Sequence, residues 1–411
     1  MLKLSVMAPA TRTRPEVELL ICCARTCVDS ERTEQIRALL REDIDWSYLI
    51  KIALRHGIMP LLYWNLNTIC PEAVPKAILS QLRDYFHNLA QRNLFLTGEL
   101  VNILLLLESH QITAVPLKGP VLAASAYGNL AFRQFYDLDI LVHERDVRKA
   151  KGLLISEGYQ PNIHLSEPEE EDSLFQWCDY GFVHNEKGTL VELHWRFTPN
   201  YFPFMPESDR LWERLESVSL AGTSVLNLSP EDLLLYLCVH GCKHVWQRLA
   251  WIADIAELLR HPQLEWRRVT EQATRLGSKR MLLLGILLAS DLLGTVLPEE
   301  VLQMMQEDAV VKWLAAQVRN QLFREADVKP SGYESSLWSI FNALLRLRMR
   351  ERLQDQFPYY LHIARFAITP NQKDRSFLLL PAKLSFLYYL VRLLRLAREY
   401  GLKPLKRRLG L

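Results

Sequence analysis

RQFYDLDILV (residues 133–142) sets two aspartates, Asp137 and Asp139, at the entrance to an uninterrupted apolar run. Alternate residues of a β-strand point to the same face, so a strand here would place both carboxylates side by side. Two carboxylates beside buried apolar residues repel each other and are costly to desolvate without a cation. The pattern therefore indicates a divalent-metal site. A strand entrance or a helix cap is the alternative interpretation of Asp-x-Asp alone.

The stretch upstream of these aspartates ends in a turn suited to an anion. AVPLKGP, residues 114–120, predicts a β-strand that stops at Gly119 and is followed by a helix. A glycine lets a phosphate approach the backbone, and the amides at a helix N-terminus carry partial positive charge. Lys118 adds a full positive charge. We therefore expect Lys118 and Gly119 to bind the phosphates of a nucleotide.

A third acidic residue lies in a later strand. LVELHW, residues 190–195, predicts a strand with Glu192 and His194 on one face and apolar residues on the other. Glu192 is the candidate third metal ligand. His194 either contacts the second substrate or is a packed, hydrogen-bonded histidine.

The segments around these motifs predict an α+β protein with a small mixed-sheet core and helical flanks. Strand and helix patterns alternate over 111–207, where they end in a hairpin, and helical patterns fill 1–110 and 208–411. Within the core, the acidic run SEPEEEDS (166–173) predicts an exposed loop. The apolar stretch that follows Ser229 predicts a long helix, with the serine as its N-cap.

Composition and charge exclude several classes of protein. The chain has 411 residues, an average globular composition and a net charge of +2, too small for a global field that attracts nucleic acid. The polar N-terminal stretch predicts no secretory leader, and no apolar run is long enough to predict a membrane-spanning helix. The seven scattered cysteines are expected to be reduced, and the expected location is the cytoplasm.

Taken together, the motifs resemble those of the polymerase-beta-like nucleotidyltransferases. That superfamily combines a glycine-containing turn, Asp-x-Asp on the next strand and a third acid on a later strand. The surrounding stretches are similar to a largely uncharacterised bacterial nucleotidyltransferase family. They read LKGPVLAASAYG, RQFYDLDILV, VELHWRF and LLLYLCVHGCKHVWQRLAWIADIAELL. The resemblance covers roughly residues 45–260 and is weaker in the tail.

The resemblance implies a chemistry. In the superfamily the three acids, here Asp137, Asp139 and Glu192, bind two Mg²⁺ ions. A nucleoside monophosphate then passes from a nucleoside triphosphate such as ATP to an acceptor hydroxyl, and pyrophosphate leaves. The acceptor is open: a small molecule, an RNA and a protein are all compatible with the motifs.

The turn departs from the superfamily pattern, because Pro120 follows Gly119 where Gly-Ser or Gly-Gly is usual. Proline lacks an N–H group, so one or two phosphate contacts are missing. Lys118 and Arg133 are the candidates to replace them, and this arrangement is closer to the abortive-infection toxin nucleotidyltransferases. Two alternatives therefore stay open: a toxin-like enzyme that nucleotidylates tRNA, and a catalytically degenerate scaffold that binds nucleotide.

CVHGCKH, residues 238–244, has the residue types of a metal motif but not its geometry. On a helix, residues two apart point about 200° apart, so one zinc ion cannot collect two cysteines and two histidines from this stretch. We interpret Lys243 and His244 as nucleotide contacts. Packing of the histidines near Asp254 is the alternative.

Two basic runs lie near the C-terminus. Arginines alternate over 346–352, and the tail carries Arg392, Arg395, Arg398, Lys403, Lys406, Arg407 and Arg408. A solvated helix face is one interpretation. A polyanion-binding surface and a peripheral membrane contact through the amphipathic tail are the others.

Overall fold

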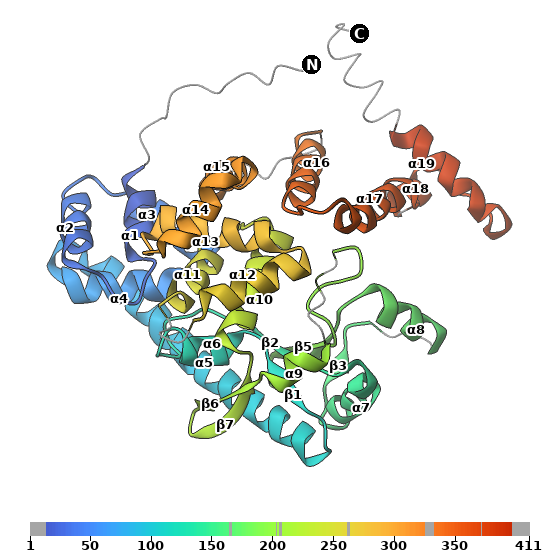
Figure 1. The fold of residues 1–411 in the computed structure, drawn as a ribbon, viewed down its shortest axis with the longest axis horizontal. Coiled ribbons are helices and arrows are strands. Elements are labelled where there is room, and N and C mark those ends of the chain that lie inside the picture. The colour runs from blue at the N-terminus through green and yellow to red at the C-terminus, as the bar shows by residue number, and fades with distance from the viewer. Residues whose placement is uncertain are drawn as a thin grey trace, which may run out of the picture.

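The computed structural model describes residues 14–163, 167–202, 204, 208–260, 264–324, 333–370 and 372–396. A five-stranded mixed sheet lies at its centre, in the order β1-β2-β5-β4-β3. Only β2 and β5 are parallel, and the other neighbours are antiparallel. The strands are β1 (Ala114–Pro116), β2 (Asp137–Val142), β3 (Gln160–Pro161), β4 (Asp179–His184) and β5 (Thr189–His194). This arrangement, with helices before and after it, confirms the predicted α+β fold (Figure 1).

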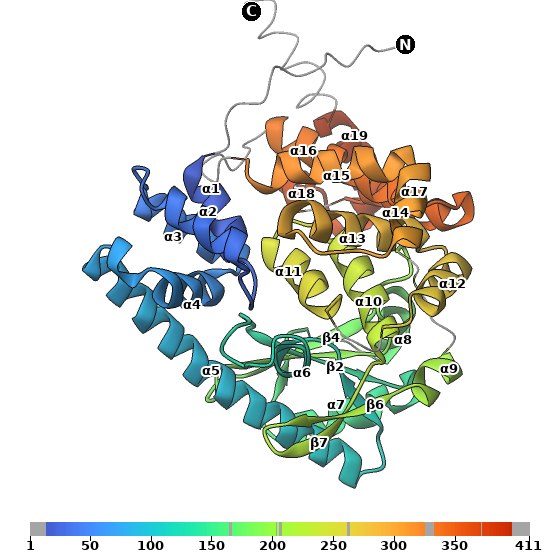
Figure 2. The same cartoon turned by 60° about the vertical axis from the view of Figure 1, so that its left-hand side comes forward.

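One long helix, which precedes the sheet in the chain, packs against it. The helix α5 (Lys76–Ser109) packs leucines of its C-terminal half into a core with Leu138 and Leu193 of the sheet. Figure 2 shows the helix running along the sheet. Because apolar residues alternate with polar ones along β2 and β5, one face of each strand is available for this core. The other elements here are α6 (Gly119–Ser125), η2 (Glu144–Asp146), α7 (Val147–Ser156), and a hairpin of β6 (Glu216–Leu220) and β7 (Thr223–Asn227).

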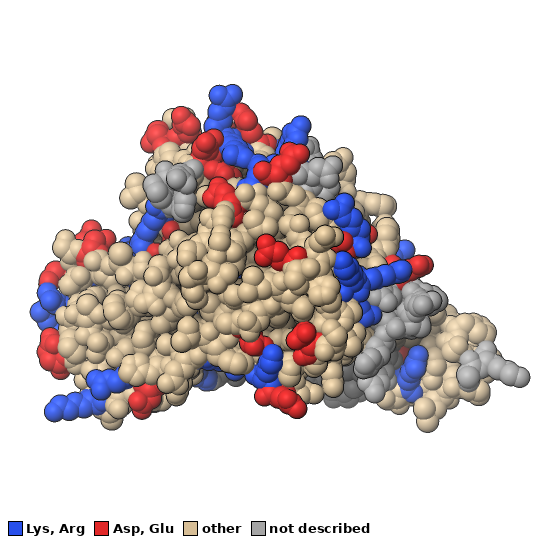
Figure 3. Space-filling view, turned by 90° about the horizontal axis from the view of Figure 1, so that it is seen from below, with Lys and Arg blue, Asp and Glu red and all other residues tan. Residues whose placement is uncertain are grey.

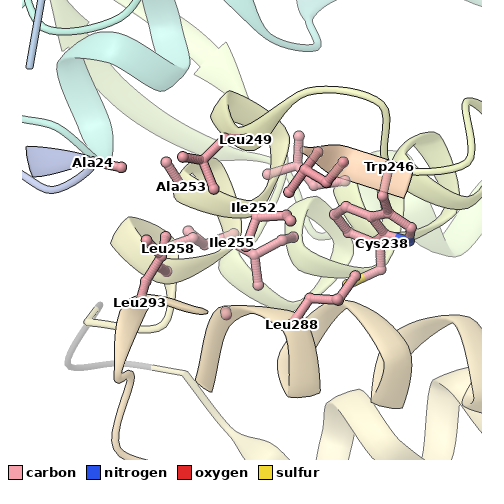
Figure 4. Close-up of a cluster of buried hydrophobic side chains, with 14 of the residues drawn as sticks. Ala24, Cys238, Trp246, Leu249, Ile252, Ala253, Ile255, Leu258, Leu288 and Leu293 are labelled. Atoms are coloured by element: carbon pink, nitrogen blue, oxygen red, sulfur yellow. The ribbon is translucent and has the colours of Figure 1, made fainter. Parts of the chain in front are cut away.

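A second, larger core is shared by the N-terminal helices and the helices that follow the sheet. The N-terminal helices α1 (Pro15–Cys23), α2 (Ser30–Leu39), α3 (Trp46–His56) and α4 (Met59–Ile69) share it with helices after residue 229. In Figure 4, Ala24 at the end of α1 lies with Ala253 and Leu258 of α11, and α13 contributes Leu288 and Leu293. The short η1 (Pro71–Ala73) follows α4.

The C-terminal region is a series of helices. They are α9 (Ser208–Glu213), α10 (Pro230–Lys243), α11 (Leu249–Leu258), α12 (Trp266–Leu276), α13 (Lys279–Leu293), α14 (Glu299–Glu307), α15 (Ala309–Leu322), α16 (Tyr333–Arg348), α17 (Leu353–Ile368), α18 (Gln372–Phe377), η3 (Ala382–Leu387) and α19 (Tyr388–Leu396). No helix among the described residues combines the length and the apolar character needed to cross a membrane. On the face in Figure 3, acidic and basic side chains are interspersed.

The predicted long helix after Ser229 is in fact two helices, α10 and α11. Val245 and Trp246 adopt left-handed backbone conformations, with φ of 53° and 52°, and end α10. This strain turns the Trp246 ring into the core, where a Cβ on Gly241 would come within 2.6 Å of it. Burial of the indole against a bare glycine offsets the strain, which the local sequence does not reveal.

Two other predictions need correction. The acidic run predicted as a loop contributes to a helix, α8 (Glu167–Gln176), since glutamates favour helices and suit the first turn. The arginines over 346–352 are not one solvated face. Arg350 is buried over the Phe202 ring, and Arg346 donates to the backbone carbonyl of Lys243.

The basic tail divides at residue 396. Arg392 and Arg395 are buried and paired with Asp374, so they do not belong to the predicted basic surface. The remaining tail cations, Arg398, Lys403, Lys406, Arg407 and Arg408, lie outside the described residues.

Candidate active site

The parallel pairing of β2 with β5 brings the predicted carboxylates together. In the strand register Asp139 lies directly beside Glu192, and Asp137 lies beside Leu190. Because side chains alternate along a strand, Asp137 and Asp139 share a face. Asp139 is buried, whereas the Glu192 side chain is 42% exposed. The three predicted acids therefore meet at one sheet face, where the Glu192 side chain is partly exposed to solvent.

His194 belongs to the same cluster. Its Nε2 lies 3.2 Å from Asp139 Oδ1 and 3.5 Å from Glu192 Oε2. Burial alone would lower the pKa of His194, but hydrogen bonds to Asp139, Cys178 and Glu192 raise it well above the ordinary value. The Nε2 atom therefore lies between two carboxylates that favour the charged form of the ring.

Lys118 supplies the second cation. Its Nζ lies 3.1 Å from Asp139 Oδ1, and its side chain is largely buried. Burial opposes the charge of Lys118, yet Asp139 outweighs it and the pKa of the lysine lies above its ordinary range. Gly119, next in the chain, has a φ of 59°, and a Cβ there would lie 3.5 Å from the backbone oxygen of Asp137. This left-handed turn, which favours glycine, holds Lys118 against the strand.

The electrostatics of the two aspartates differ. Burial raises the pKa of Asp137, and the charge of Asp139 raises it further. Burial would do the same to Asp139, but Lys118 and His194 together hold its pKa well below the usual range. Asp139 is therefore ionised throughout the physiological range, and its negative charge is the centre around which the other groups are arranged.

These residues fit a divalent cation. Asp139, Glu192 and His194 each offer a ligand atom, and these atoms lie within 4.8 Å of one another. The Oδ2 atom of Asp139 is buried and has no hydrogen-bond partner among the described residues, so its lone pairs are available to bind a metal ion. Magnesium prefers oxygen ligands, which favours Asp139 and Glu192 over the imidazole. Asp137 is not in this group, so its role as a metal ligand stays a prediction.

A neighbouring group of Cys178, Asp179 and His194 also has metal-ligand spacing. The Cys178 thiol donates to Asp179 Oδ2 at 2.9 Å, and burial raises the pKa of the thiol. A protonated thiol is a poor ligand, because metals bind the thiolate. The oxygen-rich group is therefore the better candidate.

Arg133 is paired with Asp254, and its predicted nucleotide contact stays a prediction. Its Nε and Nη2 donate to the two carboxylate oxygens of Asp254 at 2.8 and 2.9 Å, and all three groups of this network are buried. The Tyr127 hydroxyl donates to the same carboxylate at 2.7 Å. The network ties the connection between α6 and β2 to α11. We therefore assign Arg133 a positioning role in this geometry.

Lys243 is the last residue of α10, and His244 is its C-cap. The rings of His240 and His244 are 4.7 Å apart, and both contact Trp251. Burial lowers the pKa of His244 to about 3, and the charges of Lys243 and Lys118 add to this effect. Burial also lowers the pKa of His240 well below its ordinary value, so burial favours the neutral form of both rings.

The cysteines of residues 238–244 point into the hydrophobic core, away from the two histidines. Cys238 and Cys242 are buried in the hydrophobic core, and Cys238 lies next to Trp246 (Figure 4). The four residues do not converge, in agreement with the helical geometry of the sequence. Within the described residues the metal-ligand groups lie on the sheet instead.

Two neighbours of the site were not predicted. Burial raises the pKa of Tyr236 of α10 to about 12, and Lys118 and Asp139 lie close enough for their charges to act on this hydroxyl as well. Cys178 lies next to His194. Tyr236 precedes His240 by four residues and therefore lies on the same helical face, so this spacing could have predicted that Tyr236 lies near the site.

Comparison with protein families gives one match. Residues 42–294 match the model of a family described as uncharacterised nucleotidyltransferase. This match covers the sheet, α5 and the helices α10, α11 and α13 that share the larger core. A comparison with curated proteins found no match, and neither did one with solved structures.

Proposed function

Because the chain belongs to this uncharacterised nucleotidyltransferase family, we propose that it transfers a nucleoside monophosphate from a nucleoside triphosphate to an acceptor hydroxyl. In this reaction the acceptor oxygen forms a bond to the α-phosphorus. The bond from that phosphorus to the bridging oxygen of the β-phosphate breaks, and pyrophosphate leaves. The observation that carries the proposal is the register of β2 and β5, which sets Asp139 beside Glu192 within reach of Lys118.

Asp139 and Glu192 would hold the divalent cations, with Asp137 completing the set on the face of β2. When bound, Mg²⁺ supplies charge stabilisation at the attacking and leaving oxygens. Glu192 is the partly exposed acid and accepts the proton of the acceptor hydroxyl. His194 orients Glu192 and Asp139 through its Nε2.

Lys118 would bind the outer phosphates of the triphosphate. Its ammonium group is held by Asp139 Oδ1, and a triphosphate offers it a competing, more highly charged partner. Gly119 keeps the backbone next to it open. Lys243 and His244 would approach the nucleotide from α10.

The ion pair of Lys118 with Asp139 also favours a second candidate, a nucleotide-binding scaffold without transfer activity. Here the lysine takes one carboxylate oxygen, and Pro120 removes a backbone donor from the turn. A scaffold binds a triphosphate but releases no pyrophosphate.

The test combines binding with turnover. Each of the four nucleoside triphosphates is titrated with Mg²⁺ and then assayed for pyrophosphate release, with labelled triphosphate and pools of small molecules, RNA and protein as acceptors. Release that stops with EDTA supports the transferase. Binding without release in all pools supports the scaffold.

Glu192→Gln separates the two functions of the acids. The variant should bind Mg²⁺-triphosphate within a few-fold of wild type and lose transfer by about a hundredfold, the scale of positioned base catalysis. Glu186→Gln, in the exposed turn of the same hairpin, is the matched control and should be unchanged. A fully active Glu192→Gln would move the third carboxylate elsewhere, with Asp179 the next candidate.

A further inference from the structure

The C-terminal helix α19 has its polar and apolar faces inverted relative to an ordinary surface helix. Arg392 and Arg395 point inward, where they donate to Asp374 of α18 at 3.1 and 2.6 Å, and all three are buried. A surface helix normally buries its apolar face and exposes its charges. Here the single carboxylate of Asp374 holds both guanidinium groups inside.

The outward face of α19 is apolar as a result. Tyr389, Leu390, Leu393 and Leu394 are all exposed, and Leu394 reaches 67%. At 100° per residue these four positions occupy one side of the helix, and the two arginines lie on the other. No charged side chain of α19 lies among them in the described range 388–396.

The segments that lead into α19 extend this surface. Leu378, Leu379, Leu384 and Phe386 are exposed as well, with Leu379 at 85%. α18 and η3, which flank or carry these residues, both contact α19. Figure 1 shows α18 and α19 at the outer edge of the molecule, beyond α17 and away from the sheet. An apolar concentration of this kind marks an interaction site, since monomeric soluble surfaces seldom carry one.

Charge identifies the partner. The fifteen residues after α19 contain five cations, Arg398, Lys403, Lys406, Arg407 and Arg408, and one acid, Glu399. A second copy of the chain would bring the same excess of positive charge to the interface and be repelled. An anionic surface with an apolar interior satisfies both properties: leucines and a tyrosine enter the acyl boundary, and the cations that follow meet the headgroups.

We infer that the α18–α19 surface docks on an anionic lipid bilayer. This surface, formed by the exposed residues of 378–394, lies in the plane of the membrane and does not cross it. The inference concerns a face remote from Asp139 and Glu192 and does not depend on the proposed transfer reaction.

The test is flotation of the full chain with vesicles. Phosphatidylcholine vesicles containing about 30% phosphatidylglycerol should bind the protein at least tenfold more tightly than pure phosphatidylcholine, and binding should weaken at high salt. The double variant Leu390→Gln and Leu394→Gln removes apolar area without a change in charge. It should lower binding to anionic vesicles at least tenfold. Both substituted side chains are exposed, so the fold is retained.

Leu94→Gln with Leu105→Gln is the matched control, because it replaces two exposed leucines of α5. The control should bind like wild type. Equal binding by the α19 variant, equal binding to neutral vesicles, or no binding to anionic vesicles would each overturn the inference. A dimer in solution that the α19 variant dissociates would overturn it too and assign the surface to a second copy of the chain.

Discussion

Removal of the Asp254 carboxylate should strongly destabilise the protein. Asp254→Ala leaves the Arg133 guanidinium and the Tyr127 hydroxyl buried without the acceptor that now satisfies three hydrogen bonds. Loss of one partner from a buried ion pair costs about 3–5 kcal/mol. We therefore expect the free energy of unfolding, measured by urea titration with circular dichroism, to fall by about that amount.

The matched control removes the whole network. Tyr127→Phe, Arg133→Met and Asp254→Leu together leave no buried polar group unpaired, and apolar replacement of a buried pair is commonly neutral or stabilising. The free energy of unfolding of the triple variant should therefore lie within about 1–2 kcal/mol of the wild-type value. A loss of less than about 1 kcal/mol in Asp254→Ala would refute the network as a stabilising contact.

The same triple variant decides the role of Arg133. If the arginine only positions the connection between α6 and β2, the folded variant should bind Mg²⁺-triphosphate as wild type does. A selective loss of triphosphate binding in a stable variant would instead support the nucleotide contact that the sequence predicted.

Three further outcomes are expected. Lys118→Met should weaken triphosphate binding more than monophosphate binding in calorimetric titrations. It should also strengthen Mg²⁺ binding, because Asp139 loses the ammonium group that competes with the ion. Equal losses of affinity for both nucleotides would show that the lysine is purely structural. Burial holds the pKa of His56 at about 3, below its unfolded value near 6.5, so the stability that its neutral form contributes is present above pH 6.5 and is lost as the pH falls toward 3. Urea titrations across this window should show a slope up to about 1.4 kcal/mol per pH unit steeper in wild type than in His56→Gln, and parallel slopes would contradict the burial of a neutral ring. Gly241→Ala should lower the free energy of unfolding by about 1–3 kcal/mol, because its Cβ collides with the Trp246 ring; Gly98→Ala, a helical glycine with open space around it, should show no such loss.

The residues of the sheet could be predicted because they follow local rules. Period-two alternation set Asp137 with Asp139 and Glu192 with His194, and the resemblance to a family supplied the expectation that the three acids bind the same metal ions. The structure places Asp139 beside Glu192. The roles of these residues in metal binding and catalysis stay predictions.

The partners of the basic residues could not be predicted in the same way. Arg133 and Asp254 are 121 positions apart, and no local pattern indicates that the arginine turns away from the nearby acids toward α11. The partner of Arg392 and Arg395 could not be predicted either. A run of arginines predicts an exposed basic surface, and the sequence does not indicate that Asp374 is buried beside them. The break at Trp246 was missed because left-handed backbone at valine and tryptophan is locally unfavourable and becomes stable only through packing.

The larger core, which joins α1 to α13, has a consequence for synthesis on the ribosome. The N-terminal helices leave the exit tunnel long before the helices after residue 229 that complete their core, because roughly 250 residues separate α1 from α13 and elongation at about 5–20 residues per second takes on the order of 10–50 s. During this interval α1 has α2, α3 and α4 to pack against, and the part of the core that the later helices cover stays exposed. A nascent chain stalled before residue 230 should therefore bind chaperones and be cleaved readily by protease, whereas one released after residue 324 should resist.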